Sequence, residues 1–448
     1  MGYVPHSDDD VGRALEAIGV SDLESLFTDI PGTLLDPDIA LPEALDEVTL
    51  LRRVEELAAR DRSRGPNFLG GGVRAHFIPA VTPHLAFQSE FVTAYTPYQP
   101  EVSQGVLQAT FEYQSMMCEL TGLSASNASM YDGASSVAEA ALLAVRHTGR
   151  ERVLVSRGVH PETIEVLQTY LWPLHIELDV IELEGLATPT LEVGDDVACL
   201  IVQTPSFVGT LEPMAELTRA AHAAGALMIA VVDPLSLAVL ASPGEYGADI
   251  AVGDGQTIGN PVGFGGPSFG FMVVSEPLVR QLPGRLVGQT TDADGRRAFV
   301  LTLQAREQHI RRSKAKSNIC SNHQLTALMA TINLAALGPE GLREMAEGSV
   351  RRAHQLADAL RAAGGDVVHA TRFFNEFVLR IDREPRALRR ELSERGVRAA
   401  VPLPDVFGLG SAVTLSATEL TSEADIEALL AALRDCGALT GAAPEVVS

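Results

Sequence analysis

The chain has 448 residues and a formal charge of −24, because 58 Asp and Glu outnumber 34 Lys and Arg. An acidic surface repels phosphate backbones and anionic lipids, so we expect neither nucleic acid nor a membrane as a partner. No apolar stretch reaches the length of a membrane span, and residues 1–10 lack the pattern of a secretory signal. Four scattered cysteines predict no disulfide or CxxC metal site and favour a cytoplasmic location; they are Cys118, Cys199, Cys320 and Cys436.

Residues 1–65 predict an N-terminal helical arm. Short amphipathic stretches are DDDVGRALEAIGV, SDLESLF and LDEVTLLRRVEELAAR. Ser21 stands three residues before Glu24, the spacing of a capping box, so we expect a helix to begin there. The Gly- and Pro-rich passage RGPNFLGGGV then marks a boundary.

Residues 66–330 predict a large α/β domain. Five apolar, mostly β-branched runs alternate with longer helical segments; they are RVLVSR, ACLIVQT, LMIAVVD, ADIAVGD and FGFMVVS. Continuous apolar strands between helices indicate a mostly parallel sheet covered on both faces. Two helices, QLTALMATINLAALG and PEGLREMAEGSVRRAHQLADALRAAG, lead into a small C-terminal α+β domain over residues 331–448. This outline is that of fold-type-I pyridoxal-phosphate (PLP) enzymes.

Three long motifs are more specific than the outline. They are YTPYQPEVSQG at residues 95–105, GDGQTIGNPVGFGGPSFGF at 253–271 and AREQHIRRSKAKSNICSN at 305–322. These segments, with IGVSDLESLFTDIP near the start and FFNEFVLR at 373–380, resemble glycine decarboxylase, the P-protein family of the glycine cleavage system. The similarity extends from about residue 15 to 435. A chain of this length resembles the N-terminal half of the long form, called subunit 1 or alpha.

The resemblance implies a function and partners. A beta subunit (subunit 2) of the same fold would carry the PLP lysine, in an alpha2beta2 assembly. Glycine would lose CO2 on that PLP, and the aminomethyl group would pass to the lipoamide of the H-protein. This chain would complete the pocket, stabilise the beta subunit and be inactive alone.

The residues agree that no cofactor is covalently bound here. Asp233, which closes the strand LMIAVVD, stands where fold-type-I enzymes place the partner of the pyridinium nitrogen. Gln256 or Thr257 stands at the place of the Schiff-base lysine, and neither can form an imine because an imine needs a primary amine. The only two lysines, Lys314 and Lys316, lie much later in the chain.

A relic cofactor pocket would include two further features. Gly133, Ser135 and Ser136 begin a helix, where small residues and hydroxyls form an anion cradle; an ordinary helix cap is the alternative, which we prefer without the lysine. His160 falls where a ring could stack on the cofactor, although a structural loop histidine is the preferred interpretation. No HxH or HExxH spacing suggests a metal site.

Tyr95, Thr96, Tyr98 and Gln99 form a polar and aromatic cluster flanked by prolines. Such side chains hydrogen-bond a carboxylate or line a small pocket, and prolines restrict the loop. By resemblance the segment lies at the alpha–beta junction, so we expect it to contribute to the partner's active site. Packing between subunits is the alternative.

The basic segment stands out in an acidic chain; its candidate residues are Arg311, Arg312, Lys314, Lys316, Ser317 and Asn318. It would contact the partner's PLP phosphate or the acidic H-protein. A solvated helix face whose cations pair with Glu307 is an equal alternative.

The basic segment also departs from the family pattern. Ser313 replaces Glu, Lys316 replaces Thr and Ser321 replaces Thr. A divergent subunit acting on another amino acid, and a non-catalytic scaffolding or regulatory protein, therefore stay open.

Overall fold

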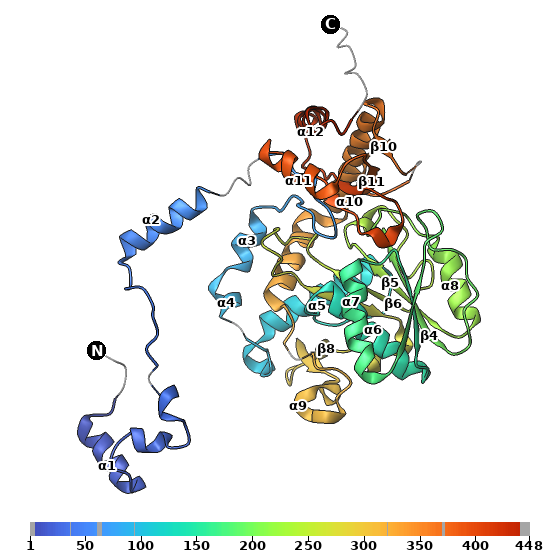
Figure 1. Ribbon diagram of the computed structural model, residues 1–448. Coiled ribbons are helices and arrows are strands. Elements are labelled where there is room, and N and C mark those ends of the chain that lie inside the picture. Colours follow the sequence, from blue (N-terminus) through green and yellow to red (C-terminus); the bar gives the residue numbers. More distant parts are fainter. Residues whose placement is uncertain are drawn as a thin grey trace. The chain divides into compact units, whose positions relative to one another are not determined.

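The computed structural model describes residues 5–35, 37–60, 65–93, 95–319, 321–369 and 372–439. Contacts divide the chain into two compact units, one up to Arg62 and one from Ser63 onward (Figure 1). Cys320 lies outside the described residues. The domain boundary predicted at residue 330 stays a prediction, and a long helix crosses that position.

The first unit consists of short, exposed helices. Helix α1 (Asp8–Ile18) begins at Ser7 with a capping box, and α2 (Glu47–Ala58) is capped by Asp46. The helix expected at Ser21 is wrong: a 3-10 turn, η1 (Glu24–Phe27), begins there without a side-chain cap. The carboxylate of Asp22 accepts the amide of Ser25 and so forms a local turn instead.

The second unit contains a seven-stranded sheet with the order β1-β7-β6-β5-β4-β2-β3. Its strands are β1 (Ala125–Ser126), β2 (Arg152–Ser156), β3 (Glu177–Ile181), β4 (Val197–Thr204), β5 (Leu227–Val232), β6 (Ile250–Asp254) and β7 (Gly270–Val274). Strands β3, β2, β4, β5 and β6 pair in parallel, and β7 pairs antiparallel with β6 and β1. The fold is thus mostly parallel, as predicted, and all five predicted strands are present.

Helices cover both faces of this sheet. Alternate strand residues point to opposite sides, and both sets of side chains are apolar. Leu200 and Val202 of β4 belong to one apolar core, with residues of α5 (Gln104–Thr121), α8 (Met214–Ala223) and α10 (Gln324–Ala362). Cys199 and Ile201 belong to the other, with α6 (Gly133–Thr148) and α7 (Pro161–Leu171). In Figure 1 α6 and α7 cross the sheet on one side. The predicted two-sided cover is confirmed.

A second, antiparallel sheet has the order β10-β11-β13-β12. Its strands are β10 (Asp366–Val367), β11 (Glu376–Arg380), β12 (Val401–Pro402) and β13 (Ala412–Ser416). Helices α11 (Pro385–Glu394) and α12 (Glu423–Asp435) pack with it around a third apolar core. A hairpin that we did not predict joins β8 (Leu286–Thr291) to β9 (Arg297–Thr302).

Helix α10 is long and apolar enough to cross a membrane by length and composition alone. It breaks at Gly338, where φ is 63°, and Pro339 follows. Its two segments are the two helices predicted, and their buried residues contribute to the first and third cores. These contacts are those of a core helix.

Candidate functional site

Five predicted residues line one pocket of about 490 Å³. They are Gly133, His160, Asp233, Gln256 and Thr257. The pocket lies at the carboxyl ends of the parallel strands, where open α/β sheets bind ligands. Ser135 and Ser136 lie in the first turn of α6 and do not line it.

The carboxylate of Asp233, directly after β5, is already fully engaged. Its Oδ1 accepts hydrogen bonds from the Thr257 hydroxyl at 2.7 Å and the Leu235 amide at 3.0 Å. Its Oδ2 lies 3.2 Å from Nη2 of Arg74, and Nη1 of Arg74 lies 2.9 Å from Glu376 in β11. All three ionic side chains are at most 10% exposed. The position expected to bind a pyridinium nitrogen therefore holds an internal ion pair.

The start of α6 is closed by the chain's own carboxylates. The Gly133 amide donates to Oδ2 of Asp254 at 3.2 Å, and the Ser135 amide donates to Asp132 at 2.7 Å. The Ser136 hydroxyl donates to the carbonyl of Asp132 at 2.6 Å. The side chains of Asp132 and Ser135 form a capping box, since the Asp132 amide also donates to the Ser135 hydroxyl at 3.3 Å, so the start of α6 is a helix cap, as preferred from the sequence, but its N-cap residue is Asp132 and not a serine. Two carboxylates at the positive end of the helix dipole occupy the place a phosphate would need.

Asp132 and Asp254 both line the pocket, and the pKa of Asp254 is perturbed. Burial raises its pKa, and hydrogen bonds from the Ser268 hydroxyl and from the amides of Gln256 and Gly133 oppose that rise. Either protonation state of this side chain obstructs an incoming phosphate. The ionised form repels it, and the neutral form still occupies the Gly133 amide.

His160 and Gln256 are held by internal bonds as well. His160 is the N-cap of α7, where Nδ1 accepts from the Glu162 amide at 3.2 Å, and its Nε2 lies 3.0 Å from the Gly71 carbonyl. Gln256 accepts from the Arg74 amide at 3.1 Å and donates to the Asn260 carbonyl at 2.9 Å.

Neither of the two lysines of the chain lines the pocket. A PLP Schiff base needs an amine, a free carboxylate and an open anion cradle, so these residues do not fit that group.

A second arrangement joins the two remaining predicted segments. The Tyr98 hydroxyl accepts a hydrogen bond from Arg285 at 3.1 Å, and that guanidinium carbon lies 5.2 Å from the centre of the Tyr98 ring. His309 approaches the same ring edge-on at 5.6 Å. The hydroxyls of Tyr95 and Ser321 lie 3.5 Å apart. We call Tyr98, Arg285 and His309 the Tyr98 cluster.

The other residues of the proline-flanked segment hold its backbone shape. The Tyr98 amide donates to the Thr96 carbonyl at 2.8 Å, and Gln99 precedes a 3-10 turn, η3 (Pro100–Val102). Tyr95 is 79% exposed and Tyr98 45% exposed, so both present ring surface outward.

Among the described residues, no Arg or Lys of the basic segment forms an ion pair with Glu307, unlike the alternative weighed from the sequence. Its neighbours within ion-pair range in the described chain are Arg285 at 3.9 Å and His309 at 3.8 Å. The exposed residues Arg311, Arg312 and Lys314 lie on α9 (Gln308–Arg311) and the turn after it. Ser317 accepts the Ile319 amide at 3.1 Å, and Asn318 is exposed.

Sequence reasoning missed Arg74, Arg285 and Glu376. Arg74 and Glu376 are 302 positions apart; Glu376 lies within the segment FFNEFVLR but was not singled out, and none of the quoted motifs includes Arg74. Arg285 lies in an ordinary stretch, LPGRLVG, and becomes notable only because folding buries it against Tyr98.

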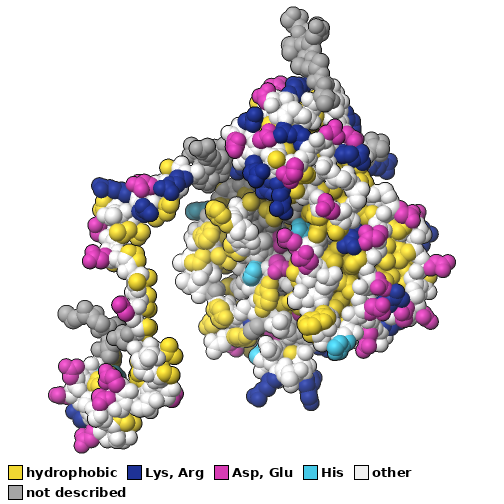
Figure 2. Space-filling view, in the orientation of Figure 1, with side chains coloured by type: hydrophobic (Ala, Val, Ile, Leu, Met, Phe, Trp, Pro, Cys, Tyr) yellow, Lys and Arg dark blue, Asp and Glu magenta, His cyan; other side chains and the backbone are white. Residues whose placement is uncertain are grey.

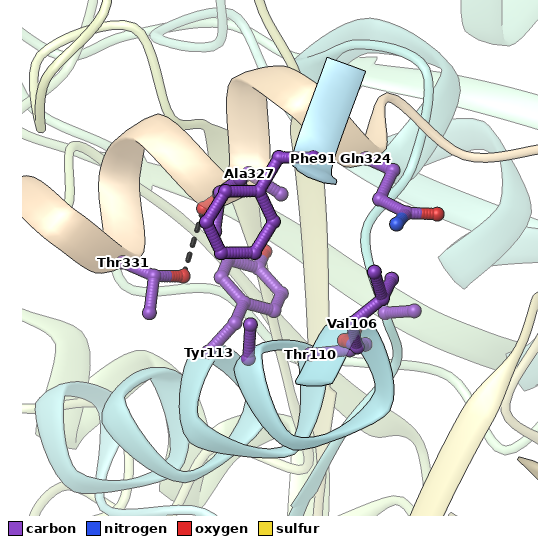
Figure 3. Close-up of a pocket in the computed structure, with 10 residues that line it drawn as sticks. Phe91, Val106, Thr110, Tyr113, Gln324, Ala327 and Thr331 are labelled. Carbon is purple, nitrogen blue, oxygen red and sulfur yellow. Dashed lines mark hydrogen bonds between the residues drawn. The ribbon is translucent and has the colours of Figure 1, made fainter. Parts of the chain in front are cut away.

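A smaller cavity of about 20 Å³ lies between α5 and α10 (Figure 3). The rings of Phe91 and Tyr113 turn toward one another there, and the Thr331 hydroxyl is bonded to the Ala327 carbonyl at 2.9 Å. Burial raises the pKa of Tyr113, which therefore stays neutral. A space of this size holds one water molecule and no substrate. In the described residues no group of three His, Cys, Asp or Glu could hold a metal ion.

Comparison with known proteins identifies the family. The glycine cleavage system P-protein family matches residues 1–433. The chain belongs to this family. A P-protein relative from Moorella thermoacetica, "Probable glycine dehydrogenase (decarboxylating) subunit 1", is 50% identical over 441 residues, which is 97% of this chain and 99% of the relative. A relative of the same name from Geotalea daltonii is 46% identical over 439 residues, with the same coverage.

Solved structures agree with this P-protein assignment. A crystal structure of glycine decarboxylase (P-protein) of the glycine cleavage system, in inhibitor-bound form, superposes with a TM-score of 0.90 at 54% identity. The superposition covers 97% of the present chain and 100% of the P-protein chain in the crystal structure. Sphingosine-1-phosphate lyase of Burkholderia pseudomallei, at 14% identity and a TM-score of 0.64, and glutamate decarboxylase of Lactobacillus brevis, at 12% and 0.66, share the fold alone. The fold is that of fold-type-I PLP enzymes, as predicted.

Proposed function

We propose that this chain is subunit 1, the alpha subunit, of a heteromeric glycine decarboxylase. It would act with a PLP-bearing subunit 2 (beta) and the H-protein, in an alpha2beta2 complex in the cytoplasm. Full-length similarity to proteins named subunit 1 supports the assignment, at 97% of this chain and 99% of the relative. One observation supports the assignment of PLP to subunit 2 and not to this chain. In the pocket of this chain, the Arg74–Asp233 ion pair and the Asp254 cap occupy the positions that a cofactor would need.

The reaction would occur on the partner. PLP held by subunit 2 would supply the electron sink for loss of CO2 from glycine, and the lipoamide of the H-protein would accept the aminomethyl group. This chain's own contribution would be to position groups and exclude water at the junction between subunits.

The Tyr98 cluster is the part of this chain best prepared for such a role. Arg285 is 3% exposed, and its hydrogen bond and cation–π contact fix the Tyr98 ring before any partner binds. A ring fixed in advance loses little entropy on contact. Tyr95, Thr96 and Gln99 would accompany Tyr98 at the partner's substrate pocket, and the basic segment would approach the partner's phosphate or the H-protein.

Glycine–bicarbonate exchange tests the proposal. Subunit 1 alone and subunit 2 alone should both be inactive with H-protein, and the mixture should be active. Full exchange by subunit 2 alone would remove the requirement for this chain.

The departures at Ser313, Lys316 and Ser321 motivate a second candidate, a subunit of a related enzyme for another amino acid. The same exchange assay over a panel of amino acids separates the two. Exchange with a different amino acid and not with glycine would favour the second candidate. Calorimetric titration against subunit 2 and H-protein that shows no binding to either would favour a scaffolding role outside this complex.

A further inference from the structure

A group of cations gathers at the far end of α6 from the pocket. Arg146 lies in the last turn of α6, 13 residues after Gly133, so a rise of about 1.5 Å per residue places it about 20 Å from the pocket. Lys316 and Arg306 line one recess, beside Glu307 and Ser317. Figure 2 shows Lys and Arg side chains together at the end of the molecule where α9 lies in Figure 1.

Arg306 is built into this recess with one donor unused. Its Nε donates to the Leu303 carbonyl at 3.0 Å and its Nη2 to the Gly284 carbonyl at 3.1 Å. Its Nη1 is buried and has no hydrogen-bond partner among the residues that the structure describes. A buried donor without a partner has lost its hydrogen bonds to water and has gained none within the protein. A ligand atom that accepts a hydrogen bond from it would therefore be stabilised.

Few carboxylates offset the cations. Glu139 accepts from the Ser317 hydroxyl and is the charge nearest to Arg146. Glu307 is shared between Arg285 and His309, although its Oε1 is also buried without a partner.

Lys316 lies where positive charge is in excess, and its pKa responds to that charge. In the described part of the chain its Nζ donates one hydrogen bond, to the Arg280 carbonyl at 3.4 Å. Burial and the nearby guanidinium groups of Arg146, Arg306 and Arg311 lower the pKa of Lys316. An anion placed among these four cations would relieve their mutual repulsion.

We propose that Arg306 and Lys316, which line this recess, form a binding site for a phosphate-class oxyanion, either inorganic phosphate or a phosphate monoester, to which Arg311 and Arg146 add positive charge. The recess itself measures about 10 Å³, enough for one oxygen atom. One ligand oxygen would enter beside Nη1 of Arg306, and the other oxygens would stay at the surface under Lys316 and Arg311. A protonated ligand oxygen, or a water, would donate to the unpaired Oε1 of Glu307.

A phosphate fits this set better than a single carboxylate. A phosphate carries about −1.5 to −2 charges at neutral pH, more than a carboxylate, and its three acceptor oxygens can bond separate donors such as Nη1 of Arg306 and Nζ of Lys316. The site does not rest on the proposed function, since it lies within this chain and can be measured without activity.

The two lysines allow a direct test by lysine acetylation and mass spectrometry of the full-length chain, alone and in complex with subunit 2. Inorganic phosphate and glycerol phosphate, at constant ionic strength set with chloride, should each protect Lys316 several-fold and leave Lys314 unchanged. Protection by the ester alone would identify the ligand as a monoester, and equal protection by both would identify the phosphate group itself as sufficient.

Matched variants complete the test by calorimetric titration with inorganic phosphate. Lys316→Gln should weaken phosphate binding about tenfold, because it removes one charge-assisted donor. Lys314→Gln makes the same change of net charge two positions away and should leave binding unchanged. Equal effects of the two variants, or equal labelling of both lysines with and without phosphate, would overturn the site. Protection by acidic H-protein but not by phosphate would assign the cluster to a protein partner and also overturn it.

Discussion

At the scale of single residues, Arg74 joins segments that are far apart in sequence. It links the stretch before α3 (Val81–Ala86) to Asp233 after β5 and to Glu376 in β11, and both partners are less than 10% exposed. Removal of one member of a buried ionic group leaves the others without compensation. That cost exceeds the modest stability that the intact group contributes.

Arg74→Ala should therefore lower the free energy of unfolding by about 3–5 kcal/mol. Urea denaturation followed by far-UV circular dichroism measures the change. The control is Arg343→Ala, which removes an exposed pair with Glu347 at 3.9 Å and should change stability by less than about 1 kcal/mol. Equal effects of the two variants would mean that the buried ion pair in the pocket matters no more for the free energy of unfolding than an exposed one.

Glu212 gives the stability a pH dependence. It is 7% exposed, and burial raises its pKa to about 7, although hydrogen bonds from Thr188 oppose the rise. Its pKa in the folded state lies above the ordinary value of 4.5, so the unfolded state releases the proton first as pH rises. The contribution of Glu212 to stability therefore falls between about pH 4.5 and pH 7 and stays low above that window.

Glu212→Gln should remove this fall. At pH 8 we expect the variant to be more stable than the wild type by about 2–3 kcal/mol, and at pH 4.5 the difference should approach zero. Thermal or urea unfolding at both pH values measures it. A difference that does not change with pH would show that Glu212 does not titrate as described.

At the scale of secondary-structure elements, close packing of β7 against α6 depends on Gly270. A Cβ at Gly270 would overlap the Asp132 carbonyl and the Ser136 hydroxyl, which together hold the first turn of α6. Gly105 in α5 is the matched case, because a Cβ there would meet no atom within 4 Å.

Gly270→Ala should destabilise the protein by about 1–3 kcal/mol, since the core must shift to admit a methyl group. Gly105→Ala should instead stabilise it by up to about 1 kcal/mol, because alanine restricts the unfolded chain and favours helix. Denaturation midpoints of both variants give the comparison. A loss of stability in both would point to a general effect of the substitution.

Periodicity in the sequence revealed the central elements but not the marginal ones. The five predicted strands are apolar throughout because helices cover both sides of them. Strands β1 and β12 have two residues each, too few for a pattern, whereas the run DVVHAT, which begins at Asp366, indicated β10. The edge strand β3 is only partly buried, and the hairpin β8–β9 was signalled only by Asp294–Gly295 in its turn.

The candidate site shows the same limit. Motifs located Asp233, Gln256 and Thr257, which lie together at one pocket. Their partners Arg74 and Glu376 come from opposite ends of the chain, and only folding brings them there. Sequence alone predicts which chemistry is missing more readily than what replaces it.

At the scale of the whole molecule, the substituted pocket should make this chain insensitive to PLP. A ligand raises the melting temperature only if it binds the folded state. We expect the melting temperature to be constant as PLP is added, with subunit 2 as a responsive control. The spectrum should show no aldimine band that borohydride abolishes. A dose-dependent rise, or such a band, would contradict the interpretation of the pocket.

The Asp254 cap on α6 has a consequence for assembly. A carboxylate tethered beside the Gly133 amide acts at a fixed effective concentration, which dilution cannot lower and a cofactor shortage cannot affect. We therefore expect this chain to fold without PLP. With PLP held by the proposed subunit 2, a shortage of PLP should lower the amount of complex through that subunit, while this chain stays folded.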